Sequence, residues 1–134
     1  MGVLYAVGSD ESETPARALV SALNAQFAKD APDARTKVNL LYYLGPDSLP
    51  DALEGLAAIY VAPGFGGEVG TIAKIAAKSH VLTICGSARN AHAGLAVALV
   101  GENNHPHIYI NAGALKADGA EFDPAFMGLT EPLP

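Results

Sequence analysis

The stretch YVAPGFGGEVGTIAKI, residues 60–75, joins an apolar run to an amphipathic segment through a glycine-rich loop. The run before the loop has the composition of a buried strand. The segment after it carries apolar side chains at helical spacing: Val69, Ile72, Ala73 and Ala76. We therefore expect a strand over residues 58–62 and a helix over residues 67–78. A strand that passes through a short loop into a helix is the repeating unit of α/β folds.

The same unit recurs along the chain. Apolar segments predict strands at residues 3–7, 37–43 and 81–85, and periodic segments predict helices near residues 14–29 and 47–56. Thr14 and Pro15 indicate a helix start, because they place an N-cap residue before a proline at the first helical position.

The C-terminal third predicts a different arrangement. Residues 95–100 and 107–110 are apolar and flank GENNHP, which suits the turn of a hairpin. A helix near residues 111–117 and a last helical turn near residues 124–129 complete the chain. Asn111 would cap the first of these helices.

Together these elements predict one α/β domain over residues 1–134. Repeated strand–helix alternation favours a three-layer sandwich with a mostly parallel sheet of flavodoxin or Rossmann type. The near-continuous apolar strands agree with burial on both faces. The hairpin should add an antiparallel edge at the C-terminal end.

Composition restricts the classes of partner. The 134 residues carry a net charge of −6 and include no block of lysine or arginine, so a nucleic-acid partner is not expected. No apolar run approaches the ~18 residues of a membrane span, so insertion into a membrane is not expected either. The chain enters a strand directly after Met1 and shows no signal peptide, which leaves a cytosolic protein or one whose leader is removed.

Three polar loops should meet at one edge of the sheet. In open α/β sheets, ligands bind outside the carboxyl ends of the strands. The loops expected there supply our candidate ligand-binding residues: Ser9, Asp10, Gly64, Phe65, Gly66, Gly67, Ser87 and Arg89. We expect the loop after residue 62 to be a flexible lip with Phe65 at its tip, so that truncating Phe65 would hardly change the melting temperature. Arg89 is the cation that an anionic ligand or partner would meet.

A phosphate-binding role is disfavoured. PGFGGEVGT lacks the Gly-Lys-Ser/Thr ending of a P-loop, and Glu68 already complements the start of the following helix. The first loop, GSDESET, is rich in hydroxyl groups like a flavodoxin phosphate loop, but Asp10, Glu11 and Glu13 would repel a phosphate. We therefore expect no flavin or nucleotide cofactor.

Catalytic and metal-binding patterns are weak. His105 and His107 alternate on one strand, which favours a solvated pair over a metal site. Cys85 ends an apolar strand and is expected to be a buried small hydrophobe rather than a nucleophile. Ser9 and Ser87 lack the Gly-x-Ser-x-Gly context of a nucleophile elbow. No catalytic residue and no metal ligand is therefore predicted.

The C-terminal half resembles the YfiR family of periplasmic regulatory proteins. The similar segments are the strand of residues 81–84 (VLTI), the turn of residues 93–95 (AGL) and the strand of residues 108–111 (IYIN). The alanine-rich residues 114–120 and the tail of residues 126–129 align with the family's last helix and C-terminus. The clear resemblance covers about the last 55 residues of the 134.

The resemblance implies a function without catalysis. Members of the family act through protein partners, and the best-known activity is repression of a membrane-bound diguanylate cyclase through its periplasmic domain. It therefore implies a periplasmic location after removal of a leader, a membrane-associated signalling protein as partner, and a homodimer as a further assembly. Two alternatives remain open: a small-molecule-binding domain that serves transport, and a small enzyme of flavodoxin-like architecture.

Overall fold

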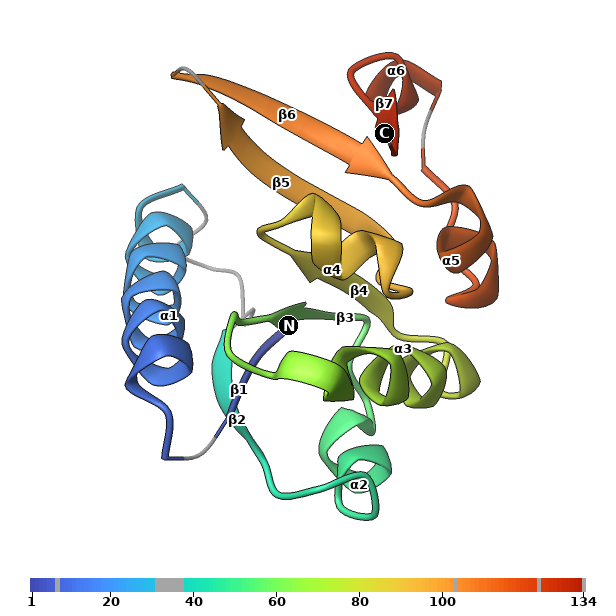
Figure 1. The fold of residues 1–134 in the computed structure, drawn as a ribbon. Helices are drawn as coiled ribbons and strands as arrows, with labels where there is room; N and C mark the ends of the chain where they lie inside the picture. Colours follow the sequence, from blue (N-terminus) through green and yellow to red (C-terminus); the bar gives the residue numbers. More distant parts are fainter. Residues whose placement is uncertain (7, 31–37, 103, 123, 134) are drawn as a thin grey trace.

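A computed structural model describes residues 1–6, 8–30, 38–102, 104–122 and 124–133 (Figure 1). The strands are β1 (Gly2–Ala6), β2 (Asn39–Tyr43), β3 (Ala58–Val61), β4 (Leu82–Cys85), β5 (Val97–Glu102), β6 (His105–Ile110) and β7 (Glu131–Pro132). The helices are α1 (Asp10–Asp30), α2 (Leu49–Leu53), α3 (Val69–Lys78), α4 (Ala88–His92), α5 (Ala112–Ala117) and α6 (Pro124–Met127), and a 3-10 turn, η1 (Gly66–Glu68), leads into α3.

The strands form one sheet in the order β2-β1-β3-β4-β5-β6-β7. The first five strands are parallel and follow the order of flavodoxin-like sheets. In this order β2 is added on one side of β1 and β3 on the other, so the switch point lies between β1 and β3. β6 pairs antiparallel with β5. The predicted α/β class, with its mostly parallel sheet and antiparallel hairpin, is confirmed.

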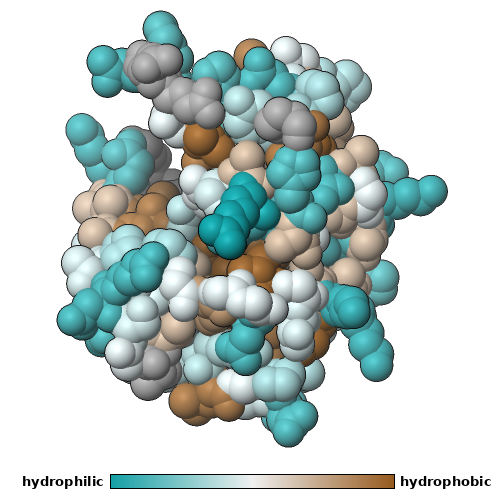
Figure 2. Space-filling view, viewed as in Figure 1, coloured by the Kyte–Doolittle hydropathy of each residue, from teal (hydrophilic) through white to brown (hydrophobic). Residues whose placement is uncertain are grey.

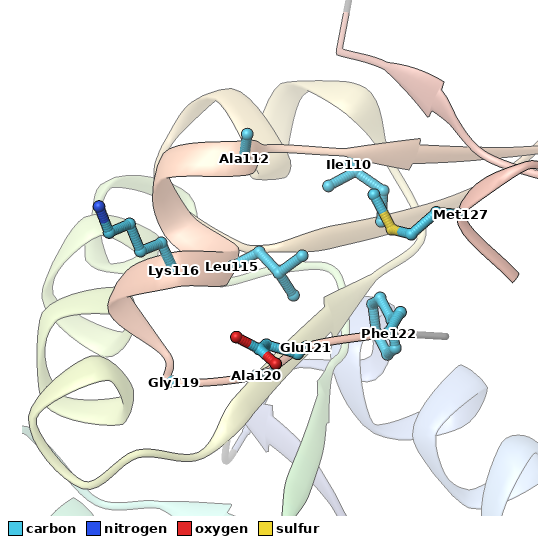
Figure 3. Close-up of a pocket in the computed structure, with 9 residues that line it drawn as sticks. All are labelled: Ile110, Ala112, Leu115, Lys116, Gly119, Ala120, Glu121, Phe122 and Met127. Carbon is cyan, nitrogen blue, oxygen red and sulfur yellow. The ribbon is translucent and has the colours of Figure 1, made fainter. Parts of the chain in front are cut away.

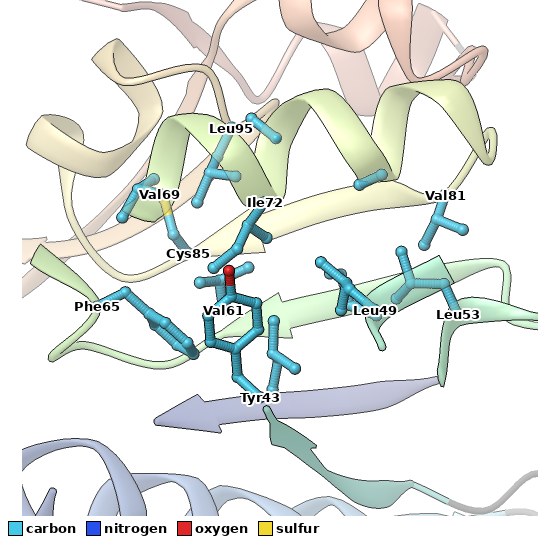
Figure 4. Close-up of a cluster of buried hydrophobic side chains, with 14 of the residues drawn as sticks. Tyr43, Leu49, Leu53, Val61, Phe65, Val69, Ile72, Val81, Cys85 and Leu95 are labelled. Atoms are coloured by element: carbon cyan, nitrogen blue, oxygen red, sulfur yellow. The ribbon is translucent and has the colours of Figure 1, made fainter. Parts of the chain in front are cut away.

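Alternation along the central strands separates two hydrophobic layers. On β1, Val3 and Tyr5 pack with α1, whereas Leu4 belongs to the larger cluster on the opposite face. That larger cluster joins β3 and β4 to α2, α3 and α4, and its side chains interdigitate beneath α3 (Figure 4). The sheet therefore lies between helical layers, as a strand with period-two burial requires.

The first helix begins earlier than predicted. It starts at Asp10 rather than at Pro15, which lies inside the helix. The carbonyl of Ser9 accepts hydrogen bonds from the N–H groups of Ser12 and Glu13, so Ser9 rather than Thr14 starts the helix. Three acidic residues in the first turn favour this early start, because they complement the positive end of the helix dipole.

A buried polar network anchors α5 to the sheet. The Asp118 carboxylate accepts hydrogen bonds from the Thr83 N–H at 3.0 Å and from the Thr83 hydroxyl at 2.8 Å. The Thr83 hydroxyl oxygen in turn accepts from the Ala96 N–H at 2.9 Å. Pairing between β4 and β5 begins only at Ile84 and Val97. The Asp118 and Thr83 side chains therefore accept from the N–H groups of Thr83 and Ala96, which lie just before the two strands begin to pair.

The end of the chain adds a strand that the sequence analysis did not expect. β7 pairs parallel with β6 through Glu131 and Pro132, beyond the hairpin. The Leu133 N–H also donates to the Ile110 carbonyl at 3.2 Å. Asn111 caps α5 as expected, with its side-chain oxygen accepting from the Ala114 N–H.

Candidate functional site

The three predicted loops do meet at the carboxyl edge of the sheet. They border a crevice of about 390 Å³ between the start of α1, the loop after β3 and the start of α4. Its lining residues are Glu11, Pro63, Gly64, Phe65, Gly66, Ser87, Arg89 and Asn90. The crevice lies beside the point where the strand order reverses, which is where α/β sheets bind ligands.

Five of the eight candidate residues line this crevice: Gly64, Phe65, Gly66, Ser87 and Arg89. Ser9 directly precedes α1, Asp10 is its first residue and Gly67 lies in η1, and none of the three lines the crevice. Sequence reasoning missed Glu11 and Asn90 as lining residues, although each adjoins a predicted one, whereas Pro63 belongs to the loop that was predicted there. Ligand binding at these residues stays a prediction.

The loop after β3 is packed against the start of α1. Gly64 has a φ of +98°, and a Cβ atom there would lie 3.1 Å from the Ser12 Cβ and 3.3 Å from the Ser9 hydroxyl. Ser12 is itself fixed, since its hydroxyl accepts from the Ala6 N–H at 2.8 Å. Glycine at position 64 therefore permits both the backbone conformation and the close approach of the two loops.

The expectation of a flexible lip with Phe65 at its tip is wrong. Phe65 is only 6% exposed, and its ring meets Tyr43 edge to face, with centroids 5.3 Å apart (Figure 4). The following residues form the 3-10 turn η1 instead of an open loop. The physical reason is hydrophobic burial: an aromatic ring next to an apolar cluster is more stable inside it than over a polar crevice.

Tyr43 carries a buried hydroxyl beneath this turn. The side chain is 7% exposed, and the hydroxyl has no hydrogen-bond partner among the described residues. Burial raises the pKa of Tyr43, and the nearby Glu68 carboxylate raises it further. The ring therefore remains neutral and serves to pack against Phe65.

The wall formed by α4 is held by short-range hydrogen bonds. The Ser87 hydroxyl caps the helix by accepting from the Asn90 N–H at 3.2 Å. The Cys85 thiol donates to the Ser87 carbonyl at 3.2 Å, and burial raises the pKa of this thiol. Cys85 is fully buried, which confirms the expectation of a small hydrophobe in the core.

The crevice combines two opposite charges. Arg89 comes from α4 and Glu11 from the first turn of α1, and both side chains are exposed. Across the described parts of the chain, neither residue forms an ion pair, whereas the neighbouring Glu13 is occupied by Arg17 at 2.9 Å. Figure 2 shows strongly hydrophilic side chains over α4, with apolar atoms directly beneath them. The crevice thus offers a cation and a carboxylate that have no ion-pair partner among the described residues, together with the apolar lining residues Pro63 and Phe65.

The histidine pair does not form a metal site within the described residues. The His107 Nδ1–H donates to a Glu131 carboxylate oxygen at 2.8 Å, and the His107 ring stacks on Tyr109. His105 is exposed at the start of β6. In the residues the structure describes, no group of three or more His, Cys, Asp or Glu side chains could hold a metal ion.

A second cavity, of about 670 Å³, lies between α5 and the C-terminal tail (Figure 3). Leu115, Phe122 and Met127 give it an apolar lining, with Lys116 and Glu121 as its charged residues. None of the candidate residues from the sequence lies here. This cavity is larger than the crevice but sits away from the loops at the carboxyl edge.

No helix in the described ranges is long and apolar enough to cross a membrane. A search of curated proteins finds no match to the chain.

Similar solved structures share the fold at low sequence identity. A ligand-free, open structure of CD0873, a substrate-binding protein with adhesive properties from Clostridium difficile, has a TM-score of 0.67 at 16% identity. A conserved domain protein from Vibrio cholerae gives 0.68 at 15%, and an ABC domain in complex with L-Trp from Streptococcus pneumoniae gives 0.67 at 12%. Each match covers 98% of this chain but 52% or 53% of the other. The chain therefore spans about half the length of these structures.

The resemblance noted in the C-terminal half extends much further along the chain. A family model described as YfiR/HmsC-like matches residues 8–131. The match includes α1, the loop after β3 and every lining residue of the crevice. The chain belongs to the YfiR/HmsC-like family.

Proposed function

We propose that this protein is a non-enzymatic regulatory domain that acts through a protein partner and is controlled by a small ligand in the carboxyl-edge crevice. The observation that carries the proposal is that Arg89 and Glu11, two opposite charges without ion pairs among the described residues, line one crevice at the switch point of the sheet. Membership of the YfiR/HmsC-like family supports a regulatory role.

The charges of the crevice favour a small anion or zwitterion. Arg89 would pair with a carboxylate, and Glu11 would pair with an ammonium group or repel a second anionic group. Asp10 adds negative charge at the same loop, which disfavours polyphosphates. We expect FMN, ATP and GTP to bind no tighter than about 1 mM, a free energy of only about −4 kcal/mol. Calorimetry checks this, and micromolar binding of any of them would contradict it.

The proposed partner is a membrane-bound signalling protein with a periplasmic domain, such as a diguanylate cyclase. The test is co-expression of the chain, directed to the periplasm, with the membrane-bound cyclase or sensor kinase encoded nearest to its gene. Lower cyclic-di-GMP, or lower kinase output, together with a complex between the purified domains would support the proposal. An unchanged output and no complex would contradict it.

Transport is the second candidate function. It is favoured by the likeness of the whole chain to about half of CD0873, a substrate-binding protein. The same crevice would then deliver its ligand to a transporter rather than change a signalling partner. Uptake of a labelled ligand that depends on this protein, without any change in cyclic-di-GMP, would favour transport over regulation.

A further inference from the structure

The cavity of about 670 Å³ beside α5 has no part in the proposed function. Its walls come from the end of β6, from α5, from the segment of residues 119–122 and from α6 (Figure 3). Ligand cavities in proteins commonly have volumes of about 300–1,000 Å³. This cavity is therefore large enough for a small organic molecule, and it shares no lining residue with the crevice between Arg89 and Glu11.

The cavity is lined mainly by apolar side chains. Ile110 and Leu115 are buried, and Phe122 packs against the hydrophobic cluster that contains both. Met127 adds a wall that is 38% exposed. Methionine is flexible and polarizable, so this wall can adapt to ligands of different shape. An apolar group that enters the cavity would be removed from water, which is favourable.

Glu121 supplies the charge at this cavity. Figure 3 shows its carboxylate among the apolar side chains, below Leu115, whereas the Lys116 side chain extends away from the other labelled side chains. Neither charged residue forms an ion pair with another described residue. The carbonyls of Leu115 and Lys116 already accept from the N–H groups of Ala120 and Gly119. A polar group of a ligand would therefore meet a carboxylate, which accepts hydrogen bonds and attracts a cation.

We propose that this cavity is a second ligand site, and that it binds an apolar primary amine. The ammonium group donates to the Glu121 carboxylate, and the hydrocarbon part fills the space between β6, α5 and α6. An anionic ligand is disfavoured, because it would bring a like charge to Glu121. An amine without a carboxylate is in turn unsuited to the crevice, where it would meet Arg89. The two sites therefore select different ligands.

A ligand in this cavity would also hold the C-terminal tail against the sheet. Ile110 and Met127 both line the cavity, so a bound amine contacts β6 and the segment before β7 at the same time. The Leu133 N–H donates to the Ile110 carbonyl at 3.2 Å. Because a ligand stabilises the conformation to which it binds, the Leu133 amide should exchange more slowly with solvent when the amine is present.

The test is an NMR titration of the ¹⁵N-labelled chain with three probes that share one ring: cyclohexylmethylamine, cyclohexylmethanol and cyclohexanecarboxylate. The amine should give saturable shifts at the amides of Leu115, Ala120 and Phe122, with a Kd below about 1 mM. It should leave the crevice amides of Gly64 and Gly66 unchanged. The neutral alcohol should bind about tenfold more weakly, since it lacks a charge-assisted hydrogen bond, and the carboxylate should not saturate the site.

Glu121→Gln tests the charge without changing the size of the side chain. This variant should bind the amine about tenfold more weakly and the alcohol as before. Glu54→Gln is the matched control, because Glu54 is an exposed glutamate at the end of α2 that does not line the cavity, and it should bind the amine like the original protein. Lys116→Gln should not weaken amine binding.

Four results would overturn the proposal: no saturable shift at the cavity amides, equal affinity for all three probes, amine binding that survives Glu121→Gln, or shifts confined to the crevice. Tightest binding of the carboxylate, lost in Lys116→Gln, would assign the cavity to anions and overturn it too. Ligand binding at the crevice is measured at other amides and with other variants, so it stands or falls separately from these outcomes.

Discussion

The hydroxyl of Tyr43 is a polar atom in the centre of an apolar cluster. It is buried next to Phe65 and has no hydrogen-bond partner among the described residues. An unsatisfied buried hydroxyl costs about 1–3 kcal/mol. Tyr43→Phe keeps the ring and removes the hydroxyl, so the free energy of unfolding in urea should stay the same or rise by up to about that amount. A loss of more than about 1 kcal/mol would mean that the hydroxyl has a stabilising partner.

Phe65 belongs to the same cluster and should respond in the opposite direction. Its side chain is almost fully buried, so Phe65→Ala leaves a cavity between η1 and Tyr43. Truncation of a core phenylalanine costs about 3–5 kcal/mol. Urea denaturation of Phe65→Ala should show a loss of this size. A change within about 0.5 kcal/mol, the usual range for exposed loops, would restore the flexible-lip interpretation.

Asp118 predicts a pH dependence with a defined sign. Burial raises its pKa, and the hydrogen bonds from Thr83 only partly oppose this effect. A raised pKa means that the folded state holds the proton more tightly than the unfolded state. The contribution to stability is therefore fully present below the unfolded value of ~3.9 and is lost as the pH rises through the folded pKa.

The matched comparison is Asp118→Asn, which keeps an oxygen to accept from the Thr83 N–H but does not ionise. The unfolding free energy of the original protein should fall relative to that of Asp118→Asn as the pH rises from ~4 to ~7. A difference that stays constant across this pH range would contradict the assignment.

At the scale of elements, the glycine loop after β3 contains positions with opposite requirements. Gly64→Ala should destabilise the protein, because φ is +98° and the new Cβ would press on Ser12; left-handed backbone alone costs about 1–2 kcal/mol. Gly67 has open space around its Cβ position and no positive φ. Gly67→Ala should therefore stabilise the protein by about 0.4–1 kcal/mol, because alanine lowers the conformational entropy of the unfolded chain. Thermal unfolding of the two variants checks this, and equal effects would contradict a packed loop.

The elements that could be predicted from sequence are those whose periodicity is strong. α3 and the four core strands were expected within one to three residues, because Val69, Ile72 and Ala76 or unbroken apolar runs identify them. The start of the predicted strand at residues 37–43 falls partly outside the described residues. The start of α1 was predicted about one turn too late. Thr14 and Pro15 have the pattern of a helix start, but the helix already begins at Asp10, directly after Ser9. β7 was missed because two residues, one of them proline, carry no strand pattern.

At the scale of the whole molecule, topology made the site predictable in outline. The carboxyl ends of β1, β3 and β4 must lie together in a parallel sheet, and this brings Gly64, Ser87 and Arg89 to one crevice. The direction of each side chain could not be predicted. Phe65 turned inward to the core and Glu11 toward the crevice, because these choices depend on packing between segments far apart in sequence.

The central claim is that the crevice between Arg89 and Glu11 is the ligand site of this protein. The most direct measurement is an NMR titration of the ¹⁵N-labelled protein with a panel of amino acids and small carboxylates. We predict shifts at the amides of Gly64, Gly66 and Asn90 that are lost in Arg89→Ala and retained in Arg17→Ala. Shifts confined to the cavity around Leu115 and Phe122, shifts that survive Arg89→Ala, or no shift with any compound would contradict the claim.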